Sequence, residues 1–151
     1  IKYPIYHLDF ESFPCPLPRF KGERAYMQSL FQFSLHIETV PGVCDKEKDH
    51  YEFLAYNMTD LRKELVEKLC NLIQDDGGSV LVYNQAFEKT RIKELAQFFP
   101  EFTEQLNDIN SRLFDLLHVV KTNSKLFGSI FILQSLHNMC IVQCALCFIV
   151  C

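Results

Sequence analysis

The segment IYHLDFES at residues 5–12 alternates apolar and polar side chains and carries two acids two positions apart. Successive side chains of a β-strand point to opposite faces, so we expect Asp9 and Glu11 on one face and their apolar neighbours on the other. Two carboxylates on one rigid strand repel each other unless a cation or a proton compensates their charge, and such oxygen ligands suit Mg²⁺ or Mn²⁺. The alternative is an acidic strand end exposed to solvent. The segment predicts a strand that carries an acidic pair.

A third acid, Glu88, follows another predicted strand. Residues 79–83, SVLVY, are mostly apolar, as expected of a central strand covered on both faces, and Gly77-Gly78 marks the turn before it. A helix is predicted over residues 87–98. Asn84 lies between this strand and this helix, where its amide can hydrogen-bond a catalytic carboxylate or the backbone of the following turn.

These two segments, Asp9-Phe10-Glu11 and Asn84-x-x-Phe87-Glu88, resemble the first two motifs of the DEDD exonuclease superfamily, which has a ribonuclease H-like fold. The resemblance implies a two-metal Mg²⁺ or Mn²⁺ site for phosphodiester hydrolysis, with Asp9 bridging the ions. Glu11 and Glu88 would complete the ligand set. Glu88 stands where the superfamily usually has Asp, and its extra methylene alters the reach of the carboxylate.

A closer resemblance covers roughly residues 3–130 and is to a bacterial family of unknown function, numbered 2779. Glu at the position of Glu88 is the ordinary choice in that family, but the family brings no demonstrated activity, and a fold alone does not establish a function. The resemblance rests on the order of five segments: Asp9-Phe10-Glu11, residues 31–36, residues 83–91, residues 115–117 and Gly128-Ser129.

Two further residues are candidates for supporting roles at this site. Asp115 lies where superfamily members often have an Asp in the fifth strand, and it would ligate metal directly or only support the site. His36 lies on the polar face of the predicted second strand. It can reach a substrate or a metal-bound water, although an exposed strand histidine is the favoured interpretation.

Hydrophobic periodicity predicts one α/β domain with a mixed five-stranded sheet and flanking helices. The first three strands are expected to form an antiparallel meander. The order strand, strand, strand, helix, strand, helix, strand is that of a ribonuclease H-like fold. The predicted strands are residues 5–12, 31–38, 51–56, 79–83 and 112–120, and the predicted helices are residues 60–73, 87–98 and 101–109.

Composition limits the function classes. The chain has 151 residues, 48% hydrophobic content and a net charge of −4, enough for one core but too acidic to hold nucleic acid by bulk charge. Nucleic-acid contacts must then be local, and residues 19–24 and 89–93 are the candidate basic segments. No apolar run reaches the roughly 18 residues of a membrane span, and no signal peptide is visible. We expect a cytoplasmic piece of a longer protein that has other domains.

The last 21 residues, 131–151, differ from the rest. Residues 134–151 hold four cysteines and no charged side chain. We expect residues 1–130 to be a ribonuclease H-like domain that is incomplete at its C-terminus, and residues 131–151 to be a non-native tail translated out of frame. The cysteine spacing resembles a metal cluster, but a cluster is disfavoured because no Gly, Pro or charge shapes a ligand loop.

The sequence therefore predicts a metal-dependent 3′–5′ exonuclease-like domain acting on single-stranded DNA or RNA, with Asp9, Glu11 and Glu88 as catalytic metal ligands. The superfamily takes a fourth acid from a helix after the fifth strand, and no Asp or Glu follows Asp115. The isolated chain is thus expected to have little or no nuclease activity. The alternative is a non-catalytic nucleic-acid-binding or protein-interaction module.

Overall fold

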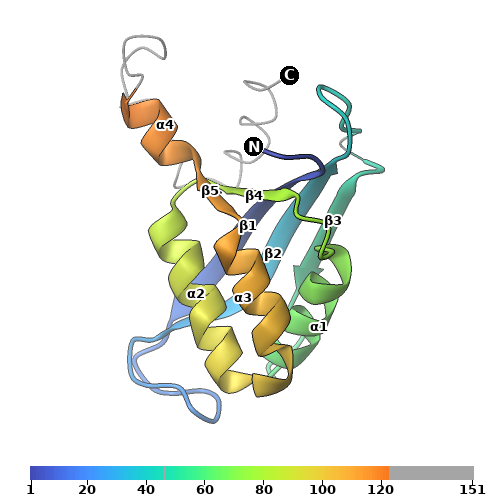
Figure 1. Ribbon diagram of the computed structural model, residues 1–151. Coiled ribbons are helices and arrows are strands. Elements are labelled where there is room, and N and C mark those ends of the chain that lie inside the picture. The colour runs from blue at the N-terminus through green and yellow to red at the C-terminus, as the bar shows by residue number, and fades with distance from the viewer. Residues whose placement is uncertain (46, 123–151) are drawn as a thin grey trace.

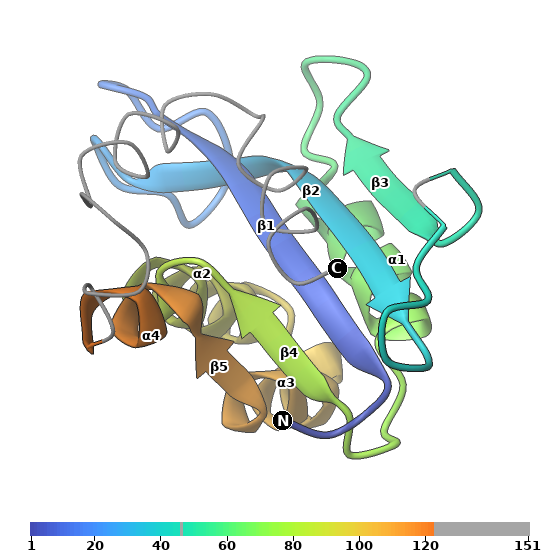
Figure 2. The ribbon, with the colours of Figure 1, turned by 90° about the horizontal axis from the view of Figure 1, so that it is seen from above.

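The computed structural model describes residues 1–45 and 47–122 of the chain. In this part, five strands form one mixed sheet with the order β3-β2-β1-β4-β5 (Figures 1 and 2). β1 pairs antiparallel with β2, and β2 pairs antiparallel with β3, which confirms the predicted meander. β4 and β5 continue the sheet parallel to β1. The strands are β1 (Ile5–Pro14), β2 (Gln28–Glu38), β3 (His50–Leu54), β4 (Ser79–Val82) and β5 (Leu113–Asp115).

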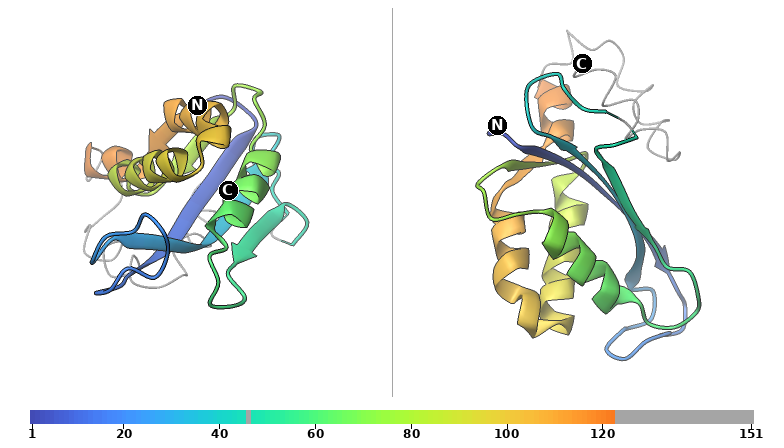
Figure 3. Two further views of the ribbon diagram at one scale, coloured as in Figure 1. Left: turned by 90° about the horizontal axis from the view of Figure 1, so that it is seen from below. Right: turned by 90° about the vertical axis from the view of Figure 1, so that its right-hand side faces the viewer.

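Helices flank this sheet, so the domain is α/β as the sequence predicts. α1, α2 and α3 all cover the same face of the sheet, as the side view shows (Figure 3). The longest described helix, α2, has 14 residues, and no helix in the described ranges meets the length and hydropathy required of a transmembrane span. The helices are α1 (Arg62–Leu72), α2 (Gln85–Phe98), the short 3₁₀ helix η1 (Pro100–Phe102), α3 (Thr103–Ser111) and α4 (Leu116–Thr122).

The hydrophobic core lies between the helices and the covered face of the sheet. Alternation along β1 sends Leu8 and Phe10 into this core. Each fully buried side chain of this size stabilises the fold by about 1.5–3 kcal/mol. Further core side chains come from every layer: Phe33, Leu35, Val80 and Val82 from strands, and Leu65, Leu69, Ile92, Leu95, Leu106 and Ile109 from helices.

The opposite face of the sheet is polar. Asp9 lies opposite Ser34 of β2, and Glu11 lies opposite Gln32, so the expected acidic pair does share one face. The expectation that His36 is exposed is wrong, because only 5% of its surface is accessible. His36 instead forms a hydrogen bond of 3.0 Å between its Nε2 and Nδ1 of His50 on β3.

The predicted fifth strand is too long. Strand pairing stops at Asp115, and residues 116–122 form α4 instead of continuing the sheet to residue 120. Asp115 explains the change, because its Oδ1 accepts a hydrogen bond of 3.2 Å from the backbone N–H of His118. A carboxylate that accepts from the third residue of a helix is a typical N-cap, and such a cap favours helix over strand.

Two predictions fall outside the described residues. The Gly128-Ser129 segment and the whole proposed tail, residues 131–151 with its four cysteines, lie beyond residue 122.

Candidate metal centre

The predicted site residues lie where the parallel strands end. Asp9 comes two positions after His7, which is the last residue of β1 paired with β4. Asp115 is the last residue of β5 and lies beside Val82, the last residue of β4. In Figure 2 the three strands point the same way, and α2 and α4 begin near their carboxyl ends. In open α/β sheets this edge, next to a switch in strand order, is where ligands usually bind.

Asp9 and Glu11 form the first part of the site. Both side chains are half-buried on the polar face of β1. Burial, followed by the charge of the neighbouring Glu11 carboxylate, raises the pKa of Asp9 to about 6, against a smaller opposing effect of a backbone hydrogen bond. The pair therefore carries negative charge that the strand itself does little to stabilise.

Glu88 forms the second part. It lies in the first turn of α2, and only 3% of its surface is accessible. Burial raises the pKa of Glu88 to about 8, and the charges of Asp9 and Asp115 act in the same direction against a backbone hydrogen bond. The Oε2 atom of Glu88 is buried and has no hydrogen-bond partner among the described residues. Such an atom is costly to bury unless something else binds it.

No cation of the described chain neutralises this group. Asp9, Glu11, Glu88 and Asp115 form no salt bridge with residues 1–45 or 47–122. Carboxylates that have no paired cation are the ligand type that Mg²⁺ and Mn²⁺ prefer. The four side chains do not converge on a single point in the structure. No three His, Cys, Asp or Glu side chains of the described ranges are placed to hold a metal ion together.

Residues 6–138 of the chain match the model of the domain of unknown function DUF2779. The chain belongs to this family. The matched range includes all four acids of the site, and it ends eight residues past residue 130, the limit of the domain predicted from the sequence. No curated protein and no solved structure matches the chain.

Asp115, Asn84 and His36 were proposed as supporting residues of this DUF2779 domain, and the last two differ in position. Asn84 is the N-cap residue of α2, directly between β4 and Glu88, and its side chain forms no capping hydrogen bond. Its amide is thus not engaged in the helix cap. His36 lies farther across the sheet, opposite His7 of β1, and its hydrogen bond to β3 directs it away from the acids.

Sequence reasoning missed Tyr83 as a neighbour of the site. Its ring is 7% exposed and packs against Leu116 and Leu117 of α4. Burial raises the pKa of Tyr83, and the charge of Asp115 adds to this effect. The sequence feature that could have identified Tyr83 is its position at the end of an apolar strand, next to Asn84.

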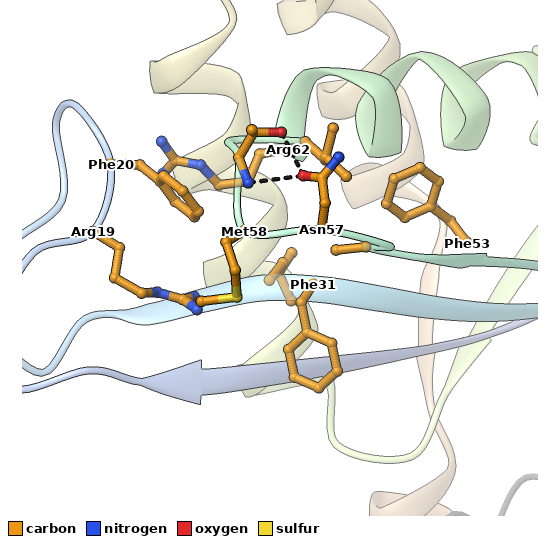
Figure 4. Close-up of a pocket in the computed structure, with 11 residues that line it drawn as sticks. Arg19, Phe20, Phe31, Phe53, Asn57, Met58 and Arg62 are labelled. Carbon is orange, nitrogen blue, oxygen red and sulfur yellow. Dashed lines mark hydrogen bonds between the residues drawn. The ribbon is translucent and has the colours of Figure 1, made fainter.

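A separate cavity of about 190 Å³ lies on the helix-covered side, between α1, β2 and the loop before β2 (Figure 4). Arg62 lines it but is already paired with Asp60 at 2.7 Å and with Glu23 at 3.4 Å. Asn57 accepts two hydrogen bonds from Thr59, drawn as dashed lines in Figure 4. Arg62 and the side-chain oxygen of Asn57 are therefore already engaged within the chain.

Proposed function

We propose that this DUF2779 domain is a metal-dependent phosphodiesterase of the 3′–5′ exonuclease type, with a ribonuclease H-like fold and a DNA or RNA strand as substrate. The observation that carries the proposal is Glu88, a buried carboxylate with an unpartnered oxygen beside the charges of Asp9 and Asp115. Burying such a group costs several kcal/mol, and its Oε2 gains no hydrogen bond from the described residues in return. Strongly shifted acids of this kind cluster at functional sites.

The order of elements supports the fold part of the proposal. Three antiparallel strands are followed by alternating helices and parallel strands, which is the order that the superfamily resemblance implies. The first two motifs also occupy corresponding places, because Asp9 and Glu11 lie on β1 and Glu88 lies at the start of α2.

Each residue then has a defined task. Asp9 and Glu88 would bind the metal directly, and Glu11 would complete the shell from the same strand face. Bound Mg²⁺ or Mn²⁺ would supply activation of a water molecule and stabilisation of the leaving oxygen. Because Glu88 is mainly protonated at neutral pH, it must release its proton when it becomes a ligand. Its burial keeps bulk water away from that side of the site.

One observation favours a second candidate, a non-catalytic nucleic-acid-binding or protein-interaction module. The sequence contains no Asp or Glu after Asp115 to supply the fourth acid that the superfamily uses. A remnant of the site would keep Asp9 and Glu88 without supporting hydrolysis.

Thermal unfolding of the full chain with and without Mn²⁺ tests the metal site. Binding to the folded state alone raises the unfolding temperature, so wild type should shift upward while Asp9→Asn should not. Glu104→Gln is the matched control, since it removes an exposed carboxylate of α3 and should keep the shift. Equal shifts in all three proteins, or none in wild type, would contradict the metal site. Hydrolysis of a single-stranded oligonucleotide in the same samples then separates an active enzyme from a binding module.

A further inference from the structure

Two basic segments that lie far apart in the sequence meet at one cavity of the folded chain. Arg24 belongs to the loop between β1 and β2, in residues 19–24, and Arg91 belongs to α2, in residues 89–93. Both arginines line an open cavity of about 380 Å³. The remaining lining residues are Ala25, Tyr26, Met27, Gln28 and Glu94.

Arg91 is a buried cation, and one of its three guanidinium nitrogens lacks a hydrogen-bond partner among the described residues. Its surface is 8% exposed, and its Nη1 donates to the backbone oxygen of Gln28 at 3.3 Å. Its Nη2 lies 3.0 Å from Oε1 of Glu94, and the guanidinium lies over the ring of Phe87. Its Nε is buried and has no hydrogen-bond partner in the described ranges. The chain thus leaves part of this guanidinium without an acceptor, and the hydrogen bonds that a guanidinium makes to phosphate oxygens are of the strong, charge-assisted kind.

The charge balance of the cavity is positive. Arg24 is exposed and forms no salt bridge with any described residue. Glu94 is the one acid among the lining residues, and it faces two arginines. Burial raises the pKa of Glu94, while the charges of Arg91 and Arg24 act against that effect. The cavity thus has surplus cationic capacity in a chain whose net charge is −4.

An aromatic ring stands at the same cavity. Tyr26 is 70% exposed and has a φ of 59°, which is uncommon for a residue with a bulky side chain. Its backbone N–H donates to the oxygen of Cys15 at 2.8 Å, and this bond holds the loop in that conformation. An exposed aromatic ring beside a cationic site is the arrangement on which nucleobases stack in proteins that bind single strands.

The cavity lies close to the proposed metal site along α2. Arg91 follows Glu88 by three positions, so the two side chains share one face of the helix about one turn apart. We infer that this cavity is a phosphate subsite for a single nucleic-acid strand whose scissile phosphate lies at Glu88, with Arg24 and Arg91 on a neighbouring phosphate and the Tyr26 ring on its base. This inference rests on the proposed function, because the position of the scissile phosphate in the nucleic-acid strand is taken from the acidic site.

Fluorescence anisotropy with labelled single-stranded DNA and RNA oligonucleotides tests this subsite in the full chain. EDTA is present throughout, so that the result does not depend on metal binding or cleavage. Arg24→Gln should weaken binding about 5- to 10-fold and reduce the slope of log affinity against log salt by about one. Tyr26→Ala should weaken binding as well, and Tyr26→Phe should restore it, because stacking needs the ring and not the hydroxyl.

Lys2→Gln is the matched control, since it removes one exposed cation that lies outside the cavity and outside both basic segments. It should change affinity less than twofold. Equal effects of Arg24→Gln and Lys2→Gln, or tight binding by both, would overturn the subsite. Arg24 is exposed, so its variant tests the subsite even if Arg91 variants fail to fold.

Inorganic phosphate separates a nucleic-acid strand from a free anion as the ligand. If the strand is the ligand, sodium phosphate should displace the oligonucleotide no better than sodium chloride of equal ionic strength. Displacement by millimolar phosphate that is lost in Arg24→Gln would show a free-phosphate site and would contradict the assignment to a strand. Arg24-dependent oligonucleotide binding by a wild-type chain whose unfolding temperature does not rise with Mn²⁺ would keep the subsite and remove the proposed nuclease function.

Discussion

At the scale of single residues, burial of the Glu88 carboxyl group lowers the stability of the fold at high pH and leaves an oxygen atom that a metal ion can bind. Its carboxyl group is buried, and its folded-state pKa of about 8 lies well above the ordinary value of 4.5. The folded protein therefore holds a proton that the unfolded chain has already lost between pH 4.5 and pH 8. Stability must fall as the pH rises through this window, and the loss is complete above pH 8.

Replacement of Glu88 by Gln should remove that loss. The amide has almost the same shape and never ionises, so Glu88→Gln should exceed wild type in unfolding free energy by about 4–5 kcal/mol at pH 8.5 and should differ little at pH 4.5. Chemical denaturation at both pH values without divalent ions measures the difference. An equal gain at both pH values would mean that ionisation of Glu88 does not control stability.

Metal binding should release the same proton. At pH 7 Asp9, with a pKa of about 6, is mainly ionised, and Glu88 is mainly protonated. Titration calorimetry with Mn²⁺ in two buffers of different ionisation enthalpy should therefore give release of about one proton per site. Release should disappear in Glu88→Gln. Binding with no proton release in wild type would place the metal away from Glu88.

Residue-level prediction succeeded where one strand determines the answer and failed where neighbouring elements do. Alternation along residues 5–12 was enough to put Asp9 and Glu11 on one face. The same rule put His36 on the polar face, but it carries no information on burial. The cross-strand hydrogen bond to His50 comes from a segment that the sequence pattern does not connect to His36.

At the scale of elements, the boundary between β5 and α4 depends on Asp115. Its carboxylate caps α4 through the His118 N–H, and its charge also acts on Glu88. Leucines at residues 116 and 117 suit either a strand or a helix, which is why hydrophobicity alone extended the strand too far. The side-chain cap decides between the two structures.

Substitutions at Asp115 separate its two effects. Asp115→Ala should lose the cap and destabilise the domain by about 1 kcal/mol, whereas Asp115→Asn should keep most of the cap. Both variants remove the charge and should lower the pKa of Glu88. Denaturation midpoints and carboxyl NMR titration of Glu88 measure the two effects. Equal stability of the Ala and Asn variants would show that the 3.2 Å contact is not a cap.

At the scale of the whole molecule, the sequence predicted the α/β class, the five strands and the three helices of the covered face. It did not predict that Arg24 and Arg91 line one cavity, because that meeting requires the β1–β2 loop to fold against α2. Periodicity reports which face of an element is apolar, but not which distant loop lies against it. The acids of the site could be predicted because they lie on strands or at the start of a helix, and both kinds of element are recognisable in the sequence.

The most direct test of the metal centre is anomalous diffraction from crystals of the full chain soaked in Mn²⁺ at pH 8, where Glu88 can ionise. We predict manganese bound by carboxylate oxygens of Asp9 and Glu88 at about 2.0–2.6 Å, and no manganese at this position in Asp9→Asn crystals. Well-diffracting crystals with no manganese there, or with manganese only at the His7–Glu38 pair across the sheet, would contradict the account.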